Sequence, residues 1–212
     1  MRALEMRAWD RWNRVRLAFL RARHRGLEVD PHASSNFAVA RYNLAPDASL
    51  RIAEGAVTER IPGRLHFILY PGARVEVAER AWLRTEVGDV HIVAFEGARM
   101  VLGPECLVNG CHLSAKSEVS LARGAMVGPG SRVFDSDQHD LDDARRERSQ
   151  PVSIGEYVWI ASDCLVLRGS CIGAHSIVGS GSIVTGEVEP HTLVYGRPAR
   201  PRGQVGDRSK AH

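Results

Sequence analysis

Hydrophobic residues change their spacing along the chain. In residues 2–25, apolar side chains recur at roughly helical intervals with arginines between them, which predicts one amphipathic helix or two short ones. Residues 30–46 are irregular and rich in turn formers. From about Leu50 onward, short apolar pairs alternate with Gly, Pro, Ser or charged residues, and no helical period survives. This pattern predicts a helix followed by an all-β body.

A six-residue repeat is clearest toward the C-terminus. A β-branched residue recurs at Ile154, Ile160, Val166, Ile172, Val178 and Val184. A small residue or a valine follows four positions later, at Val158, Cys164, Ser170, Ser176 and Ser182. Three such faces would form one triangular coil, in which the aliphatic side chain points inward and stacks on its counterpart one coil away. Small residues suit the crowded corners, and successive coils would pair as parallel strands.

The same phase continues upstream and is interrupted once. Val127 and Val133 match Ile160 and Val166, and both pairs have the same offset along the chain. This offset is longer than one coil, which is the step from Ile154 to Ile172, and we assign the excess to a loop inserted at 134–150. Further upstream the repeat is degenerate. The predicted organisation is an N-terminal helical element (1–30), a β-helix domain with the inserted loop (31–200) and a flexible tail (201–212).

Charge and cysteine content restrict the class of protein. The 212 residues carry a net charge of +3, too little to predict nucleic-acid binding. The four cysteines show no CxxC or zinc-knuckle spacing, so we expect thiols in a reducing cytoplasm and no bound metal. No run of ~18 apolar residues predicts a membrane span. The N-terminus lacks an uninterrupted apolar stretch, so no signal peptide is expected.

Three linked motifs lie in residues 152–202. They read IGEYVWIA from Ile154, IGAHSIVGSGSIV from Ile172 and EPHTLVYGRPAR from Glu189. This segment resembles the C-terminal half of the hexapeptide acetyltransferases, the family of galactoside, maltose, streptogramin and many sugar O-acetyltransferases. The resemblance implies a left-handed parallel β-helix, a homotrimer and active sites in the grooves between neighbouring prisms. It also implies acetyl-CoA as co-substrate and a hydroxyl of a sugar or polysaccharide as acceptor.

The inserted loop is the expected site of the chemistry, because long loops on rigid scaffolds commonly carry function. In the family that the chain resembles, a histidine in this loop is the catalytic base, and His139 occupies the matching place. A neutral imidazole with a pKa of ~6.5 can accept the proton of an attacking hydroxyl. A carboxylate could fix the tautomer of that ring. The candidates are Asp137, Asp135 and Asp140, and the sequence does not choose among them. Upstream of the loop, Asn109 and His112 could face the acceptor, with a surface role as the alternative.

Coenzyme contacts are expected along a stack of small corner residues, where a pantetheine arm could lie against the backbone. The residues that the resemblance implicates are Trp159, Ala161, Ser162, Gly179, Ser180, Thr185 and Arg200. An arginine suits the phosphates because its planar guanidinium pairs bidentately with their oxygens. The chain departs from the family at Gly186, where a lysine is common, so Arg197 or Arg202 could supply that contact. Glycine is also common where this chain has Ala161, and alanine where it has Ser180.

The basic N-terminal helix admits two interpretations. It could pack on the side of its own β-helix through Trp9, Trp12 and Phe19. It could instead lie on a membrane surface, because arginines alternate with Trp, Phe and Leu. The second interpretation would place a cytoplasmic enzyme at the inner face of a membrane.

Other functions compete with sugar O-acetylation. The acceptor could be an amino group, which would make the chain an N-acetyltransferase of an amino sugar. The β-helix could be a non-catalytic scaffold. A γ-class carbonic anhydrase shares the fold but needs three histidines around zinc, and the sequence shows no paired histidines at one-coil or half-coil spacing.

Overall fold

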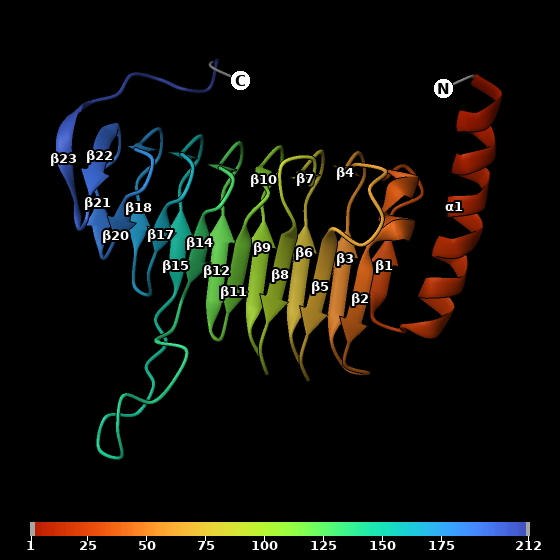
Figure 1. The fold of residues 1–212 in the computed structure, drawn as a ribbon, viewed down its shortest axis with the longest axis horizontal. Coiled ribbons are helices and arrows are strands. Elements are labelled where there is room, and N and C mark those ends of the chain that lie inside the picture. Colours follow the sequence, from red (N-terminus) through yellow and green to blue (C-terminus); the bar gives the residue numbers. More distant parts are fainter. Residues whose placement is uncertain (1–2, 211–212) are drawn as a thin grey trace.

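The computed structural model describes residues 3–210, which form a three-sided prism of strands with a helix at one end (Figure 1). The chain passes through three sheets in turn, so each coil adds one strand to each sheet. Residues 1, 2, 211 and 212 of the predicted helix and tail lie outside the described residues. No helix within residues 3–210 is long and apolar enough to cross a membrane.

Each sheet forms one face of the prism. Sheet A contains β1 (Leu27–Val29), β3 (Ser49–Ile52), β6 (Arg74–Val77), β9 (Arg99–Leu102), β12 (Glu118–Leu121), β15 (Val152–Ile154), β18 (Cys171–Ile172) and β21 (Glu187–Val188). Sheet B contains β2 (Arg41–Leu44), β5 (Leu65–Leu69), β8 (Val90–Ala94), β11 (His112–Ala115), β14 (Arg132–Phe134), β17 (Leu165–Val166) and β20 (Ile183–Val184). Sheet C contains β4 (Val57–Thr58), β7 (Trp82–Arg84), β10 (Leu107–Asn109), β13 (Met126–Val127), β16 (Trp159–Ile160), β19 (Ile177–Val178), β22 (Thr192–Gly196) and β23 (Ala199–Gln204).

The strand register confirms the predicted repeat. Ile154 pairs with Ile172, and Ile160 pairs with Val178, one coil apart. Val127 pairs with Ile160 across the predicted insertion. These side chains are all but fully buried in the interior of the prism, where stacked aliphatic groups provide the main stabilising free energy. The predicted fold class, an all-β left-handed parallel β-helix with an N-terminal helix, is confirmed.

Close backbone approach explains the small residues at the corners. A Cβ atom on Gly173 would lie under 3.0 Å from the backbone nitrogen of Pro190 in the next coil. The buried hydroxyl of Ser176 donates to the Glu189 carbonyl at 2.9 Å and accepts from the Thr192 amide at 3.1 Å. Corner residues must therefore be small, and a hydroxyl there satisfies backbone groups that the turn leaves unpaired.

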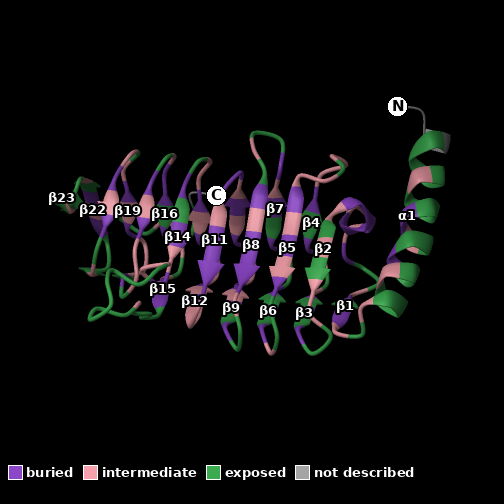
Figure 2. Cartoon of the chain, turned by 60° about the horizontal axis from the view of Figure 1, so that its bottom comes forward, coloured by how far each residue is buried: buried purple, intermediate pink, exposed green. Residues whose placement is uncertain are grey.

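The N-terminal helix α1 (Ala3–Arg23) covers the first coil together with the short 3-10 helix η1 (Ser35–Val39) (Figure 1). Leu17 is buried against the core, and Trp9 Nε1 donates to Asn36 Oδ1 at 3.1 Å. Packing against the body was expected to use Trp12 and Phe19 as well, and this is wrong. Their exposed fractions are 62% and 70%, and much of the outward side of α1 is exposed (Figure 2).

The C-terminal segment also departs from expectation. Strand β23 pairs antiparallel with β22, and the chain then runs back over the prism (Figure 1). The Val205 amide donates to the His191 carbonyl at 2.7 Å, and Arg208 Nε donates to the Tyr157 carbonyl at 3.0 Å. The flexible tail predicted from residue 201 is thus anchored to the body as far as Arg208, by contacts that a repeat pattern does not encode.

Candidate functional site

The long loop 134–150 leaves the prism between β14 and β15, at the corner between sheets B and A (Figure 1). Its first carboxylate, Asp135, is fully buried and accepts hydrogen bonds from the Lys116 and Ser117 amides, both at 2.7 Å. Burial raises the pKa of Asp135, although these backbone bonds favour the charged form. Asp135 therefore fixes the start of the loop and is not available to a ligand.

Two tethers hold the loop against neighbouring coils. Asp137 pairs with Arg168, which follows β17, and this guanidinium lowers the pKa of the carboxylate. Lys116 Nζ donates to the Gln138 carbonyl at 3.1 Å and lies 2.8 Å from Glu147 Oε1. These contacts restrain residues on both sides of His139.

His139 itself is exposed and, within residues 3–210, makes no hydrogen bond or ion pair. A nearby carboxylate was expected to orient its ring, and none does so in this structure. Asp137 bonds Arg168 instead, and Asp140 accepts from Arg146 Nη1 at 2.6 Å and from the Glu147 amide at 2.7 Å. The carboxylate of Asp137 thus pairs with Arg168 and holds the loop, and it does not contact the imidazole of His139.

A pocket of about 590 Å³ lies at the base of this loop. Its walls are Phe134, Ser136, Asp137, Gln138, Gln150, Leu167, Arg168, Gly169, Thr185 and Gly186. The pocket brings together Asp137, next to the predicted base, and Thr185, a predicted coenzyme contact. Gly186 has a φ of 118° and nothing within 4 Å of its would-be Cβ. The glycine that replaces the common lysine therefore leaves this side of the pocket open.

The other predicted coenzyme residues gather at a different corner. Ala161 and Ser162 follow β16, and Gly179 and Ser180 follow β19, so all four line the turns from sheet C to sheet B. Ala161 is buried and Ser180 is exposed. Sheet B separates this corner from the loop and Thr185. Within one chain, the predicted site residues thus fall into two groups, one at the corner before the strands of sheet B and one at the corner after them.

Trp159 and the arginines lie beside this second corner. The exposed fraction of Trp159 is 41%, and the Arg208 guanidinium lies 5.5 Å from its ring centroid. Arg197 Nε donates to the Gly181 carbonyl at 2.6 Å, whereas the exposed Arg200 donates, among residues 3–210, only to the adjacent Ala199 carbonyl at 3.1 Å. Arg200 therefore has a guanidinium that is free for phosphate, and Arg208 is a cation that the sequence did not suggest.

The predicted acceptor residues lie on β10 and β11, and β11 pairs with β14, the strand that precedes the loop. Asn109 ends β10, and its buried Oδ1 has no hydrogen-bond partner among the described atoms. His112 begins β11, and its ring contacts the edge of Phe134 with centroids 5.5 Å apart. Burial lowers the pKa of His112. Because Phe134 borders the pocket, His112 is one residue removed from it.

The structure also contains histidine pairs that the sequence did not reveal. His66 and His91 stack with centroids 4.4 Å apart, and His91 stacks on His112 at 5.5 Å. The expectation of no paired histidines is wrong, because it assumed that every coil has the length of the regular C-terminal ones. The upstream coils are longer and unequal in length, and the register still aligns His66 with His91 and His91 with His112. A search for variable coil lengths would have found them.

The fold is that of known acetyltransferases. The crystal structure of the polySia-specific acetyltransferase NeuO superposes with a TM-score of 0.64 at 17% identity, covering 88% of this chain and 78% of that chain. The polysialic acid O-acetyltransferase OatWY superposes with a TM-score of 0.51 at 14% identity, covering 86% of this chain and 90% of that chain. At these identities the likeness establishes a hexapeptide-repeat β-helix and nothing finer.

Sequence matches are shorter and more specific. Galactoside O-acetyltransferase of Escherichia coli (strain K12) is 38% identical over 72 residues, which are 34% of this chain and 36% of that protein. Nodulation protein L of Rhizobium meliloti (strain 1021) is 34% identical over 96 residues, which are 44% of this chain and 52% of that protein. The chain thus matches about half or less of the length of these relatives, and no family model matches it. It resembles the hexapeptide-repeat acetyltransferases, as its motifs predict.

Proposed function

We propose that this chain is an acetyl-CoA-dependent O-acetyltransferase that acts on a hydroxyl of a sugar or polysaccharide. The observation that carries the proposal is the pocket at the base of loop 134–150. There the residues next to His139 meet Thr185, in coils whose motifs resemble those that hold coenzyme A in the family. The partial matches to a galactoside O-acetyltransferase and to nodulation protein L support the same reaction class.

The chemistry is a direct transfer. The imidazole of His139 accepts the proton of the acceptor hydroxyl while the hydroxyl oxygen attacks the thioester carbonyl carbon. The carbon–sulfur bond then breaks, the sulfur takes the proton from the imidazolium, and the products are the O-acetyl ester and free coenzyme A. The pair of Asp137 with Arg168 serves as a positioning element, because it holds the loop that presents His139. Arg200 would bind the coenzyme phosphates.

Thiol release from acetyl-CoA, measured with a panel of sugar acceptors, tests the proposal. In His139→Ala the rate should fall by about 10²–10⁴-fold, the usual contribution of a general base. His32→Ala is the matched control, because the side chain of His32 is 76% exposed at the other end of the prism. Full activity in His139→Ala with normal folding would remove this residue from catalysis. Release with amino sugars alone would favour N-acetylation, the second candidate reaction.

The trimer completes the proposal, because a single chain separates the two groups of site residues. The loop and Thr185 lie at one edge of sheet B, and Ser162 and Ser180 lie at the other. If neighbouring prisms pack side by side, the loop corner of one chain can face the opposite corner of the next. Each active site would then take its base and its coenzyme-binding serines from different chains.

Sheet C offers a surface for such packing. One register row of outward side chains is apolar from β4 to β22: Val57, Trp82, Leu107, Met126, Trp159, Ile177 and Leu193. Trp82 and Trp159 are about two-fifths exposed. Sheet A instead carries charged pairs on its outward face, such as Arg99 with Glu118 at 3.0 Å. A continuous apolar row of this kind is typical of an interaction surface.

Light scattering after gel filtration tests the assembly. Met126→Glu on sheet C should dissociate the trimer, and Ser120→Glu on the outward face of sheet A should not. A monomeric wild-type chain would overturn the proposal.

Co-expression of His139→Ala with Ser162→Trp provides a second test. Activity should return in mixed trimers if the site is shared between chains, and it should stay absent if each site is formed by one chain.

The exposed face of α1 favours contact with an anionic membrane surface. Trp12, Val15 and Phe19 form one outward stripe, with exposed fractions of 62%, 62% and 70%. Arg11 and Arg16 lie beside this stripe on the helix. A helix with aromatic groups on one face and flanking arginines suits the boundary between acyl chains and anionic headgroups. This contact would hold a cytoplasmic enzyme at the inner face of the membrane.

Sedimentation with liposomes tests the contact. Wild-type protein should bind vesicles that contain phosphatidylglycerol, and Trp12→Ser/Phe19→Ser should not bind them. Arg51→Ser on sheet A is a control that removes a charge elsewhere. Equal sedimentation of the helix variant and wild type would exclude this surface as the membrane contact.

A further inference from the structure

Three imidazoles form a ladder on the outward face of sheet B. His66, His91 and His112 occupy matching positions on β5, β8 and β11. The first two rings are nearly parallel, with centroids 4.4 Å apart and planes inclined by 14°. Each ring extends from a strand of a continuous sheet, so the backbone fixes the spacing of the ladder.

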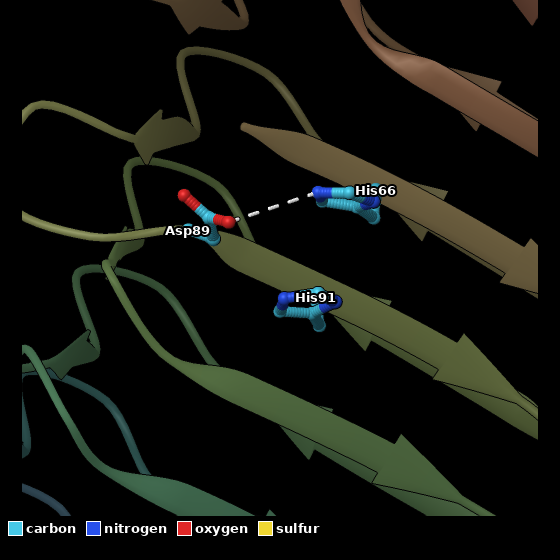
Figure 3. A group of neighbouring side chains, drawn as sticks. All are labelled: His66, Asp89 and His91. Atoms are coloured by element: carbon cyan, nitrogen blue, oxygen red, sulfur yellow. Dashed lines mark ion pairs between the residues drawn. The ribbon is translucent and has the colours of Figure 1, made fainter. Parts of the chain in front are cut away.

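A carboxylate lies close to the first two histidines of this ladder, His66 and His91. Asp89 lies just before β8, and its Oδ2 is 4.0 Å from His66 Nε2 (Figure 3). Its other oxygen, Oδ1, accepts from Arg64 Nε at 2.7 Å. One oxygen of Asp89 is thus held by an arginine, while the other is directed at the histidines. Among residues 3–210, His66, Asp89 and His91 are the one group of three potential ligands whose donor atoms lie within 4.8 Å of one another.

The His66 ring is arranged as a ligand. Its Nε2 is buried and has no hydrogen-bond partner among the described atoms. A buried imidazole nitrogen without a hydrogen-bond partner is free to bind a metal ion once the proton of the ring is on the other nitrogen.

A second histidine stack in the same protein shows that stacking alone does not produce this arrangement. His175 and His191 lie 4.7 Å apart with planes inclined by 11°. His175 Nδ1 accepts from the Arg208 amide at 3.1 Å, and His191 Nδ1 lies 3.2 Å from the Val205 carbonyl. The C-terminal segment therefore occupies ring nitrogens of this pair. His66 Nε2, by contrast, is buried and has no hydrogen-bond partner among the described atoms. Such an atom costs folding free energy unless a ligand binds it.

We propose that His66, Asp89 and His91 bind a divalent transition-metal ion, with Zn²⁺ as the best match to a donor set of two imidazoles and one carboxylate. Three protein ligands leave a fourth coordination position for water. Zinc–ligand distances of ~2.0–2.2 Å require the donor atoms to move closer together than they are here. Rotation of Asp89, whose side chain is 46% exposed, and a tilt of the His91 ring would achieve this. The ion would link β5 to β8 and so join two successive coils.

This site differs from the proposed transferase site and does not depend on it. It lies at least four coils before Thr185 on sheet B, and none of its ligands borders the pocket at the loop. It also revises the expectation of no bound metal, which rested on cysteine spacing and on an assumed coil length. The readouts of the proposal are metal binding and thermal stability, which require no knowledge of the acceptor.

Cobalt binding to the full chain tests the proposal, because Co²⁺ replaces Zn²⁺ and absorbs visible light when it is tetrahedral. Apo-protein is prepared with a chelator and titrated with Co²⁺. Visible absorption bands should appear, saturate at one Co²⁺ per chain and disappear when Zn²⁺ is added. His66→Asn and Asp89→Asn should each weaken binding at least tenfold. His175→Asn/His191→Asn, which alters the other stack, should leave it unchanged. Zinc should raise the melting temperature of wild type and of this control, and not that of His66→Asn.

A replacement ligand separates loss of a donor from loss of folding. His91→Cys should retain the ion and add a thiolate-to-cobalt charge-transfer band in the near ultraviolet. Absence of saturable cobalt bands in the wild type would overturn the proposal. Equal binding by wild type, His66→Asn and Asp89→Asn would also overturn it, since the ion would then reside elsewhere.

Discussion

Arg168 joins both ends of the inserted loop through one guanidinium. Its Nε bonds the Asp137 carboxylate, and its Nη1 donates to Gln150 Oε1 at 2.5 Å. The backbone amide of Gln150 in turn donates to the backbone carbonyl of Asp135 at 2.8 Å. Asp137 and Gln150 lie near opposite ends of the loop, so the arginine acts as a clamp at its base. The clamp also forms part of the wall of the pocket.

Arg168→Gln should therefore impair catalysis more than coenzyme binding. Release of the clamp would let the loop move, and a displacement of ~1 Å in a reacting group can cost about 10²-fold in rate. We expect kcat to fall by about 10–100-fold, with a smaller change in KM for acetyl-CoA. Arg146→Gln is the matched control, because it removes only the pair with Asp140 inside the loop. A large rise in KM with unchanged kcat would instead make Arg168 a coenzyme ligand.

Acidification should release the loop in a defined pH range. Arg168 lowers the pKa of Asp137, and the Glu147 amide and Arg146 lower the pKa of Asp140. A carboxylate with a lowered pKa in the folded state contributes stability that is present above its unfolded pKa of 3.8 and is lost as pH falls further. Hydrogen exchange of residues 136–150, corrected for intrinsic rates, should show equal protection at pH 7 and 5 and a loss of protection that begins only below the unfolded pKa of 3.8. Opening between pH 7 and 5 would implicate a histidine instead.

The sequence predicted those parts of the fold in which the type of residue at a position shows where that residue lies in the prism. Ile160 and Val178 could be aligned because an inward position tolerates only aliphatic groups, and the regular coils repeat that demand. The position of the loop followed from the break in this phase. The histidine ladder did not follow, because the alignment of His66 with His91 depends on turn lengths that vary between coils. The partners of Asp137 were also hidden, since a polar loop offers many carboxylate and arginine pairings of similar free energy.

Asn13 is a site where the sequence can be improved. Its side chain is fully buried between α1 and the first coil, and neither Oδ1 nor Nδ2 has a hydrogen-bond partner among the described atoms. An unsatisfied buried polar group costs about 1–3 kcal/mol. Asn13→Leu should therefore raise the free energy of unfolding by about 1–3 kcal/mol in urea titrations at fixed protein concentration. An unchanged or lower stability would mean that another group satisfies the amide in solution.

Gly173 tests the steric requirement at the corners of the prism. A Cβ there would meet backbone and ring atoms of Pro190 at under 3.0 Å, and backbone cannot retreat as a flexible side chain can. Gly173→Ala should lower the free energy of unfolding by about 1–3 kcal/mol, the usual cost of overpacking. Gly203→Ala is the matched control, because a Cβ at Gly203 meets nothing within 4 Å and the backbone there is not left-handed. The expected outcome is a lower urea midpoint for Gly173→Ala alone. If both variants unfold at the wild-type midpoint, close approach is not the reason that this corner of the repeat carries glycine.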